Sequence, residues 1–471
     1  MPFLESSIGI VLLLAFGLAM ILVTWFFTRH TNLSTEDFLM AGRKVPWWRG
    51  AASIAASWIW APALFVSSQM AYQLGLPGIF WFIFPNVIAV LIFIFLAPKI
   101  REKFPQGHTL PEFISQKLQD ENIHKIYFLG YAFYQLMAVS VQLFAGSMLI
   151  FLLTGIPIEI SILILASVVL IYSWISGLRA SIVTDIIQLA FIFLGLIIVI
   201  PAALDSAGGF QSVLSGIGGV EGTHTDIFDP AVAFSFGLVT SIGLIAGAIA
   251  DQQFWQRTFA FDKKSIKAGF IAGALLFGIV PIMLSLLGFI AAAPDLGIQL
   301  PERTDPSMIG VLAVASLLPG FFLVIFFLML LSGLMSTLDS GLNAFSSLYV
   351  IDAKKYTDSK NLSNARLGML IILFAGLAVA TLTAHVPDFG LKQLWWIFNA
   401  VGATLVVPTL LTLYWNKLTA KGAFYGIFIA LLVGLPIFVY ANFVDDTMMI
   451  VASAFFILAI NLFSCWIFRK R

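Results

Sequence analysis

Thirteen long apolar stretches, separated by short polar segments, dominate the hydropathy pattern of this 471-residue chain. A helix needs about 20 apolar residues to cross the hydrocarbon core of a bilayer, and each stretch is close to that length. The pattern predicts an all-α polytopic membrane protein. Its thirteen transmembrane helices are expected at 7–27, 50–72, 78–98, 126–154, 158–176, 182–204, 233–250, 266–293, 319–349, 366–384, 392–414, 419–442 and 447–468.

The first stretch, 7–27, is interpreted as a retained helix. It is long enough to span, and it has neither the basic flank nor the small-residue cleavage site of a signal peptide. No segment between the stretches is long enough to form a soluble domain. Any catalytic or signalling domain is therefore expected to belong to a separate protein.

Composition narrows the class further. Hydrophobic residues make up 60% of the chain and charged residues 10%, whereas soluble domains carry about 25% charged residues. A water-soluble globule is therefore excluded, and the net charge of +1 gives no reason to expect nucleic acid. The five histidines lie in loops or at the ends of stretches and the one cysteine stands alone, which argues against zinc or copper.

The basic residues predict the orientation of the chain. Lys and Arg concentrate in cytoplasmic loops, and an external N-terminus with thirteen crossings places 23 of the 25 on one face. The two exceptions are Arg303 and Lys392. We therefore expect the N-terminus outside and the C-terminus inside, with the largest loops, 205–232 and 294–318, external. The expected location is the plasma (inner) membrane, with multiple passes.

Polar residues inside the apolar stretches mark candidate functional positions, because an ionisable group at mid-membrane is costly. Asp185 and Asp339 are such groups, and Asp251 lies either within the membrane or at its interface. In the ninth stretch a polar stripe at helical spacing accompanies Asp339; it consists of Gly333, Ser336, Thr337 and Ser340. Hydroxyls with a carboxylate are hard oxygen ligands that suit an alkali cation. Helix–helix packing explains the small residues equally simply, but it does not require the carboxylate.

Two stretches are expected to be broken helices. Pro62 removes a backbone hydrogen bond within 50–72, and Gly243 with Gly247 interrupts 233–250. Unwound backbone at membrane depth lines cavities and binds ions, although a simple proline kink also fits. Two broken helices five spans apart indicate an inverted repeat of five plus five helices. A single transporter domain would then contain an extra helix (7–27), a first repeat (50–204), a second repeat (233–414) and two C-terminal helices (419–468).

Several motifs in the same order resemble the sodium:solute symporter family over nearly the whole chain. They are SIAASWIWAPALFVSSQMAY from position 53, GHTLPEFI (107–114), SGLRASIVTDIIQ (176–188), DQQFWQRTFAFDKK (251–264), LMSTLDSGLNAFSSLYVID (334–352) and VGATLVVPTLLTLYW (401–415). The resemblance implies the inverted-repeat fold of the leucine-transporter class, with a central site between the two repeats.

Carried over by position, the family's sodium site would use backbone oxygens and two hydroxyls. These belong to Ala56, Ile59, Gly333, Ser336 and Thr337. A deeper second site, seen in some members, would involve Asp185, Asp339 and Ser340 beside Ser336. Whether a second cation, a proton or an internal hydrogen bond resides there stays open.

The resemblance also bears on the solute. Gly247 and Ala248 stand where the sugar-transporting branch has a Tyr-Trp pair, and Trp58 stands where the proline branch is acidic. The S-W-x-W-A run with Ser67 and Ser68 is similar to the urea-transporting branch. Solute-binding candidates, each of which packing also explains, are Trp58, Trp60, Asn86, Tyr134, Gln142, Trp395 and Asn399.

Together these features predict a sodium-coupled secondary active symporter that imports a small neutral or zwitterionic polar solute by alternating access. A urea-like or amino-acid-like solute is favoured over a sugar. A proton-coupled symporter of the same fold and a passive facilitator or channel are the alternatives. No Walker-type or other enzyme motif is found, so we expect neither catalysis nor an organic cofactor. The expected partners are the sodium ion, the solute and the lipid bilayer, without nucleic acid or an obligatory protein partner.

Overall fold

The computed structural model describes residues 3–29, 34–302, 304–354, 361–387 and 389–470. Within these ranges the regular secondary structure is helical, apart from one isolated bridge between Val45 and Phe261. The longer helices are α1 (Ser6–Thr28), α3 (Trp47–Trp58), α4 (Ser67–Leu91), α5 (Phe93–Lys103), α7 (Glu121–Thr154), α8 (Ile158–Ser176), α9 (Leu178–Ser206), α12 (Leu238–Ala250), α14 (Ile266–Ala292), α16 (Gly320–Leu348), α17 (Asn361–Ala384), α18 (Leu391–Tyr414), α19 (Ala420–Ile429) and α21 (Thr447–Ile467). The short ones are α2 (Thr35–Met40), α6 (Leu110–Leu118), α10 (Phe210–Ser215), α11 (Pro230–Val232), α13 (Gln252–Ala260), α15 (Ile309–Leu317) and α20 (Leu435–Phe443).

The described chain has 12 helical segments that are long and apolar enough to cross a membrane. The all-helical membrane fold is therefore confirmed, but the count of thirteen is not. The difference arises because α3 has only 12 residues, while Pro62–Lys103 forms one run of 42 residues. The predicted stretch 50–72 is thus divided between α3 and the start of this run. Gly75, with φ 57° and ψ −145°, then separates that start from the part predicted as 78–98.

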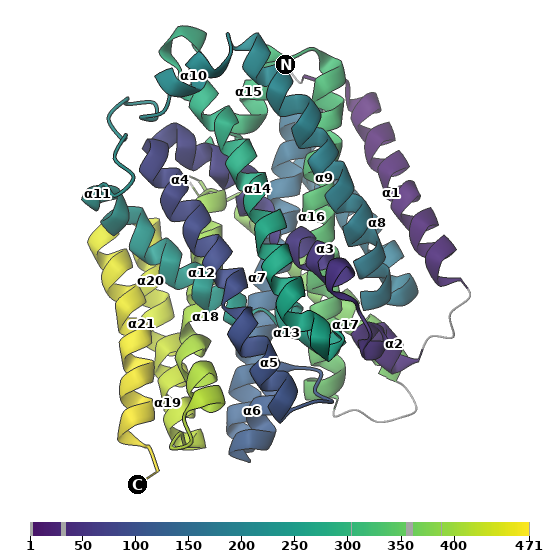
Figure 1. Ribbon diagram of the computed structural model, residues 1–471, viewed down its shortest axis with the longest axis vertical. Helices are drawn as coiled ribbons and strands as arrows, with labels where there is room; N and C mark the ends of the chain where they lie inside the picture. The colour runs from purple at the N-terminus through teal and green to yellow at the C-terminus, as the bar shows by residue number, and fades with distance from the viewer. Residues whose placement is uncertain (1–2, 30–33, 303, 355–360, 388, 471) are drawn as a thin grey trace.

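The two termini lie at opposite ends of the molecule (Figure 1), as an odd number of crossings requires. Helices α10 and α15, which belong to the two predicted external loops, lie at the end that carries the N-terminus, whereas α2 and α6 lie at the other end (Figure 1). Which end faces the cytoplasm stays a prediction from the loop charges. Of the 25 Lys and Arg residues on which that prediction rests, four lie outside the described residues: Arg303, Lys355, Lys360 and Arg471.

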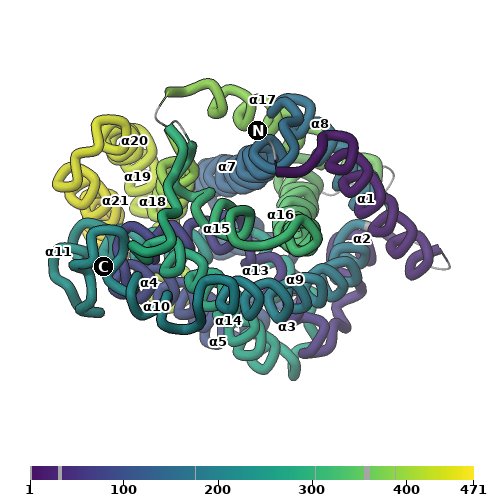
Figure 2. The backbone as a smooth tube through the Cα atoms, turned by 90° about the horizontal axis from the view of Figure 1, so that it is seen from above, coloured from purple at the N-terminus to yellow at the C-terminus, as the bar shows by residue number. Residues whose placement is uncertain are grey.

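Seen from above, α7 and α16 lie in the interior, α1 lies at one edge, and α20 and α21 lie at the opposite edge (Figure 2). The peripheral place of α1 agrees with its wide exposed apolar face, which includes Val11 and Phe27. By contrast, α16 is buried along its whole C-terminal half, where the polar stripe lies. The outer helices therefore surround the polar interior, and the boundaries of the two repeats stay a prediction.

The second broken helix exists, but the predicted position of its break was wrong. Gly243 and Gly247 lie inside the continuous helix α12, and the break falls at Asp251, whose φ of −86° and ψ of 112° separate α12 from α13. At Gly247 a Cβ would come within 2.5 Å of Asn399 Oδ1. Gly247 therefore permits close packing against α18, a use of small residues common in membrane helices.

Asp251 is buried inside the protein and caps α13, whereas its position within the membrane or at its interface stays a prediction. It is 3% exposed. Its Oδ1 accepts hydrogen bonds from the Gln253 backbone N–H at 2.8 Å and from Gln135 Nε2 at 2.9 Å. A side-chain oxygen at this position satisfies one of the unpaired N–H groups at a helix start. The short helix α13 is thereby held inside the protein.

Candidate ion and solute sites

The first broken helix opens over three residues between α3 and a π-helical turn at Pro62–Val66. Ile59, with φ −80° and ψ 65°, follows the last helical residue, Trp58, and the helix resumes at Pro62. Proline has no N–H to donate, so carbonyls at the end of α3 lose their usual helical partner. Gln142 Oε1 accepts a hydrogen bond from the freed Ala61 N–H at 3.0 Å. The predicted break before Pro62 is confirmed.

The structure places four of the five predicted sodium ligands together at this break. Thr337 Oγ1 of α16 lies 3.5 Å from the Ala56 carbonyl oxygen and 3.4 Å from that of Ile59. It also lies 3.1 Å from the Ser57 carbonyl oxygen, which the sequence interpretation missed. A Cβ on Gly333 would sit 3.0 Å from the Ile59 oxygen, so glycine lets α16 approach the break closely. The result is a buried cluster of uncharged oxygens from two helices.

Ser336, the fifth predicted ligand, is engaged elsewhere. Its hydroxyl donates a hydrogen bond of 2.6 Å to Asp185 Oδ1 of α9. The other carboxylate oxygen of Asp185 accepts from Ser53 Oγ of α3 at 2.5 Å. Ser336, which follows Met335 and precedes Thr337 on α16, is therefore bound to Asp185 in this structure.

An arginine occupies the predicted second cation site. Arg257 Nη2 of α13 donates to Asp185 Oδ2 at 3.2 Å and to Ser340 Oγ at 2.7 Å, and its Nε donates to Ser53 Oγ at 2.9 Å. Arg257 is 2% exposed and Asp185 is fully buried. The sequence interpretation had counted Arg257 among the 23 basic residues of the cytoplasmic face. Because its guanidinium is the partner of both Asp185 and Ser340, these residues do not form an open cation site in this structure.

Asp339 lies near this network but belongs to a different set of contacts. Its Oδ1 accepts from Ser173 Oγ of α8 at 2.6 Å and from Asn343 Nδ2 at 2.7 Å. The three residues predicted as one site, Asp185, Ser340 and Asp339, are therefore divided between an arginine-bound pair and a separate carboxyl.

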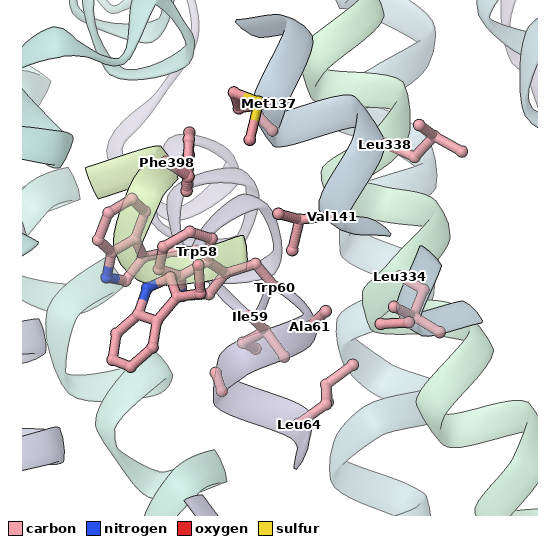
Figure 3. Packing of buried hydrophobic residues seen from close by; sticks show 14 of the residues in the cluster. Trp58, Ile59, Trp60, Ala61, Leu64, Met137, Val141, Leu334, Leu338 and Phe398 are labelled. Atoms are coloured by element: carbon pink, nitrogen blue, oxygen red, sulfur yellow. The ribbon is translucent and has the colours of Figure 1, made fainter. Parts of the chain in front are cut away.

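Aromatic rings form one wall beside the break. The indoles of Trp58 and Trp60 stack with centroids 4.9 Å apart, and Phe398 of α18 meets Trp60 at 5.3 Å. Figure 3 shows the two indoles projecting from the break toward Phe398, away from Leu334 of α16. Further ring contacts join Trp395 to Trp60 and Tyr134 to Phe398. The structure thus brings together four predicted solute residues, and Phe398 is an aromatic that the sequence interpretation missed.

Several polar atoms of the predicted solute residues have no hydrogen-bond partner among the described residues although they are buried. They are Trp58 Nε1, Trp60 Nε1, Trp395 Nε1, Gln142 Nε2, Tyr134 hydroxyl, Asn399 Oδ1 and Asn86 Oδ1. Since buried polar groups normally find partners, such a group points to an absent ligand or water. Asn86 stands apart: its amide donates to Phe82 in its own helix, and no contact within the described chain joins it to the aromatic wall.

A cavity of about 950 Å³ opens at the end of the molecule predicted to be external. Its lining includes Gln69 of α4, Met148 of α7, Asp305 and Lys392. Toward the opposite end, hydrogen bonds join α13 to neighbouring segments: Gln252 Nε2 donates to the His108 carbonyl at 2.9 Å, and Gln256 Nε2 donates to that of Leu39 at 2.9 Å. We call this second set the inner seal. The cavity lies on the Gln69 side of the break and the seal on the other.

A cluster of charges outside the membrane-spanning segments holds the inner seal to α2. His108 Nε2 lies 2.8 Å from Glu36 Oε2, and Arg43 pairs with the same carboxylate. Burial opposes ionisation of Glu36, but His108 and Arg43 outweigh it and lower the pKa of Glu36 to about 2. Burial also opposes ionisation of His108 and by itself lowers the pKa of this histidine. Glu112 and Glu36 outweigh burial, so that the pKa of His108 is raised overall.

Replacing His108 by Gln is expected to destabilise the protein in a pH-dependent way. Because the folded-state pKa of His108 is raised, its stabilisation is complete below the unfolded pKa of about 6.5 and is lost as pH rises through the folded value. The difference in melting temperature between wild type and His108→Gln should therefore narrow with increasing pH. His385→Gln, at a largely exposed histidine, is the matched control, and a gap independent of pH would contradict the assignment.

The sequence profile of the sodium:solute symporter family matches residues 38–430. The chain belongs to this family. A urea-proton symporter of rice, Oryza sativa subsp. japonica, is 25% identical over 465 residues, which cover 90% of this chain and 64% of that protein. A sodium/glucose cotransporter of Vibrio parahaemolyticus is 27% identical over 432 residues, covering 85% of this chain and 78% of that one. A urea active transporter of Saccharomyces cerevisiae is 24% identical and is covered to 60%, so the chain spans less than two thirds of both urea-transporting relatives.

Solved structures agree on the fold. An outward-open, substrate-bound Na+-coupled sialic acid symporter superposes with a TM-score of 0.77 at 18% identity, with 98% of each chain covered. A nucleobase-cation-symport-1 family transporter in a closed conformation gives 0.55 at 16% identity, covering 91% of this chain and 93% of that one. The chain therefore belongs to a family of multi-pass membrane transporters, the sodium:solute symporters. A plasma-membrane location is consistent with these relatives, which are named as transporters.

Proposed function

We propose that this sodium:solute symporter couples one sodium ion to the import of a small neutral solute of the urea type. The observation that carries the proposal is the oxygen cluster of Ala56, Ile59 and Thr337 at the broken helix. Uncharged carbonyl and hydroxyl oxygens are hard ligands suited to an alkali cation. Because they come from two separate helices, binding depends on how α3 and α16 meet. That dependence is what couples an ion to a conformational change.

The aromatic wall supports the choice of solute. Three buried indole N–H donors and one buried acceptor have no hydrogen-bond partner among the described residues. The donors belong to Trp58, Trp60 and Trp395, and the acceptor is Asn399 Oδ1. A planar solute with one carbonyl and N–H groups satisfies both kinds of atom while stacking on indole rings. A sugar, by contrast, requires many hydroxyl partners. Two of the relatives described above carry urea in their names.

Coupling to one cation is energetically sufficient for concentrative uptake. A charge crossing 100 mV gains about 2.3 kcal/mol, which supports accumulation on the order of fiftyfold before any sodium gradient is counted. A passive facilitator with the same pocket would bring the solute only to equilibrium. The rice relative's name makes proton coupling the specific competitor.

The deciding experiment measures labelled urea in proteoliposomes that contain the purified protein. The expected result is accumulation above equilibrium with an inward sodium gradient, and equilibration only when the gradient is collapsed. Accumulation driven by a pH gradient in sodium-free buffer would favour the proton-coupled alternative. Equilibration under every gradient would favour a facilitator, and absence of urea uptake while another labelled solute accumulates would overturn the choice of solute.

Tyr134→Phe is expected to raise the KM for urea about tenfold while leaving the melting temperature unchanged. Its hydroxyl is buried and has no hydrogen-bond partner in the described chain, so removing it costs the fold nothing but takes one contact, about 1.4 kcal/mol, from the solute. Tyr131→Phe, three residues away on α7, is the matched control because its hydroxyl donates to the Ile249 carbonyl at 2.7 Å. That variant should lose stability. An unchanged KM in Tyr134→Phe would remove this residue from the site.

A further inference from the structure

Four exposed basic side chains gather where α19 and α21 meet, at the end of the molecule that carries the C-terminus (Figure 1). They are Lys417, Lys421, Arg469 and Lys470. Two hydrogen bonds hold their segments together. Thr419 Oγ1 donates to the Phe468 carbonyl oxygen at 2.6 Å, and the Lys470 N–H donates to the Lys417 carbonyl oxygen at 2.7 Å. We call these four cations the basic patch.

Aromatic rings position two cations of the basic patch. Lys421 Nζ lies 4.9 Å from the ring centroid of Phe468, and Arg469 Cζ lies 4.4 Å from that of Trp466. A cation over an aromatic face is attracted by the electrons of the ring. Tyr425 of α19 packs against the same Phe468 ring, with centroids 5.6 Å apart. The basic patch is therefore formed by contacts between two helices that are distant in the sequence.

The charge of the basic patch is not balanced by acidic side chains. Within the described part of the chain, none of its four cations forms an ion pair with Asp or Glu. From 389 to 471 the sequence has only two acidic residues, Asp445 and Asp446. They precede α21, whereas Arg469 and Lys470 follow it. Because α21 has 21 residues, about 31 Å separates the two ends, well beyond the Debye length of about 8 Å.

The surface next to the basic patch is apolar and exposed. On α19 the side chains of Tyr425 and Phe428 are 41% and 42% exposed, and on α21 those of Phe463 and Trp466 are 58% and 57% exposed. Exposed apolar side chains of a membrane helix face acyl chains, and Trp and Tyr are enriched at the level of the headgroups. An inorganic anion would use the charges alone. A phospholipid uses the charges and the apolar surface together, so this combination favours a lipid.

We propose that the basic patch binds an anionic phospholipid, with the headgroup phosphate between the cations of α19 and α21. The acyl chains would lie along Tyr425, Phe428 and Trp466. Since the loop charges predict that this end is cytoplasmic, the lipid belongs to the inner leaflet. A phosphate that contacts both helices ties the start of α19 to the end of α21. Because a ligand of the folded state alone stabilises that state, the bound lipid raises the stability of the protein. The site is separate from the oxygen cluster and the aromatic wall, and it does not depend on which solute is transported.

The experiment measures binding of phosphatidylglycerol to the purified full-length protein in detergent micelles, with zwitterionic phosphatidylcholine as the reference lipid. Wild type should bind phosphatidylglycerol saturably, and its melting temperature should be higher with this lipid than with phosphatidylcholine. Removing one cation, as in Lys421→Gln, should raise the Kd about fivefold. The variant with all four cations of the basic patch replaced by Gln should lose the difference between the two lipids. The charge-preserving variant Lys417→Arg/Lys421→Arg/Arg469→Lys/Lys470→Arg should retain it.

A matched control removes four exposed lysines from the same predicted face. It is Lys117→Gln/Lys263→Gln/Lys264→Gln/Lys267→Gln, and it should keep the response to phosphatidylglycerol. If this control weakens lipid binding as much as the loss of the basic patch does, binding follows overall charge and the proposal is overturned. Inorganic phosphate alone should not raise the melting temperature. An equal rise with phosphate would make the patch a site for a free anion instead of a lipid, and equal wild-type melting temperatures in the two lipids would also overturn the proposal.

Discussion

Thr337→Ala is expected to raise the sodium concentration for half-maximal uptake by about tenfold to a hundredfold. The Thr337 hydroxyl lies within 3.5 Å of three carbonyl oxygens at the broken helix, those of Ala56, Ser57 and Ile59. A polar contact to a charged group contributes about 1.5–3 kcal/mol, which converts to that range of affinity. The measurement is the sodium dependence of urea uptake in proteoliposomes.

Two variants isolate the hydroxyl from the helix that carries it. Thr337→Ser keeps the oxygen and should retain most of the sodium affinity. Ser332→Ala removes a buried hydroxyl of the same helix that donates to its own helix at the Leu328 carbonyl, and its sodium dependence should stay at the wild-type value. Ser336→Ala should also weaken sodium binding, because its hydroxyl oxygen, which donates to Asp185 in this structure, is a predicted sodium ligand. A wild-type sodium dependence in the double variant Ser336→Ala/Thr337→Ala would remove both residues from the site.

Arg257→Gln is expected to give the largest loss of stability of any single substitution considered. It leaves the carboxylate of Asp185, which is 0% exposed, without its cation. Breaking one partner out of a buried ion pair costs about 3–5 kcal/mol, whereas neutralising both partners costs far less. The melting temperature of the purified protein should therefore fall steeply in Arg257→Gln and in Asp185→Asn, and should recover partly in the double variant.

Arg366→Gln is the matched control for the loss of a guanidinium. Arg366 is half-buried and donates to the Trp174 carbonyl from the molecule's periphery rather than to a carboxylate. Its replacement should lower the melting temperature only slightly. If the double variant Asp185→Asn/Arg257→Gln were as unstable as Arg257→Gln alone, the two residues would not act as a pair.

Residues that disturb a helix locally were predictable from the sequence. Pro62 removes a backbone donor, so the sequence predicted either a broken helix or a simple kink before it, and the structure shows the break at Ile59. A glycine is a weaker indication of a broken helix, because it also allows two helices to pack closely. Gly247 therefore misplaced the second break, which falls at Asp251 instead. Hydropathy also could not show that the chain after the first break would form one helical run of 42 residues, with a kink at Gly75 inside it.

The sequence could not predict which side chains from distant segments contact each other. Arg257 lies 72 positions from Asp185 and 83 from Ser340. It was counted with the basic residues of the cytoplasmic face because nothing in its local sequence marks it as buried. The resemblance to the family likewise grouped Asp339 with Asp185 in one deeper site. Only the tertiary contacts of Ser173 and Asn343 separate the two carboxyls. The sodium ligands were predicted together because the resemblance to the family supplied the pairing of α3 with α16.

The central claim is that a sodium ion binds where the broken helix meets α16. Equilibrium binding of radioactive sodium to the purified protein, without any solute, tests it most directly. The account predicts saturable binding of one ion per chain in wild type and a loss of about tenfold or more in affinity in Thr337→Ala. Saturable binding of unchanged affinity in Thr337→Ala would contradict it.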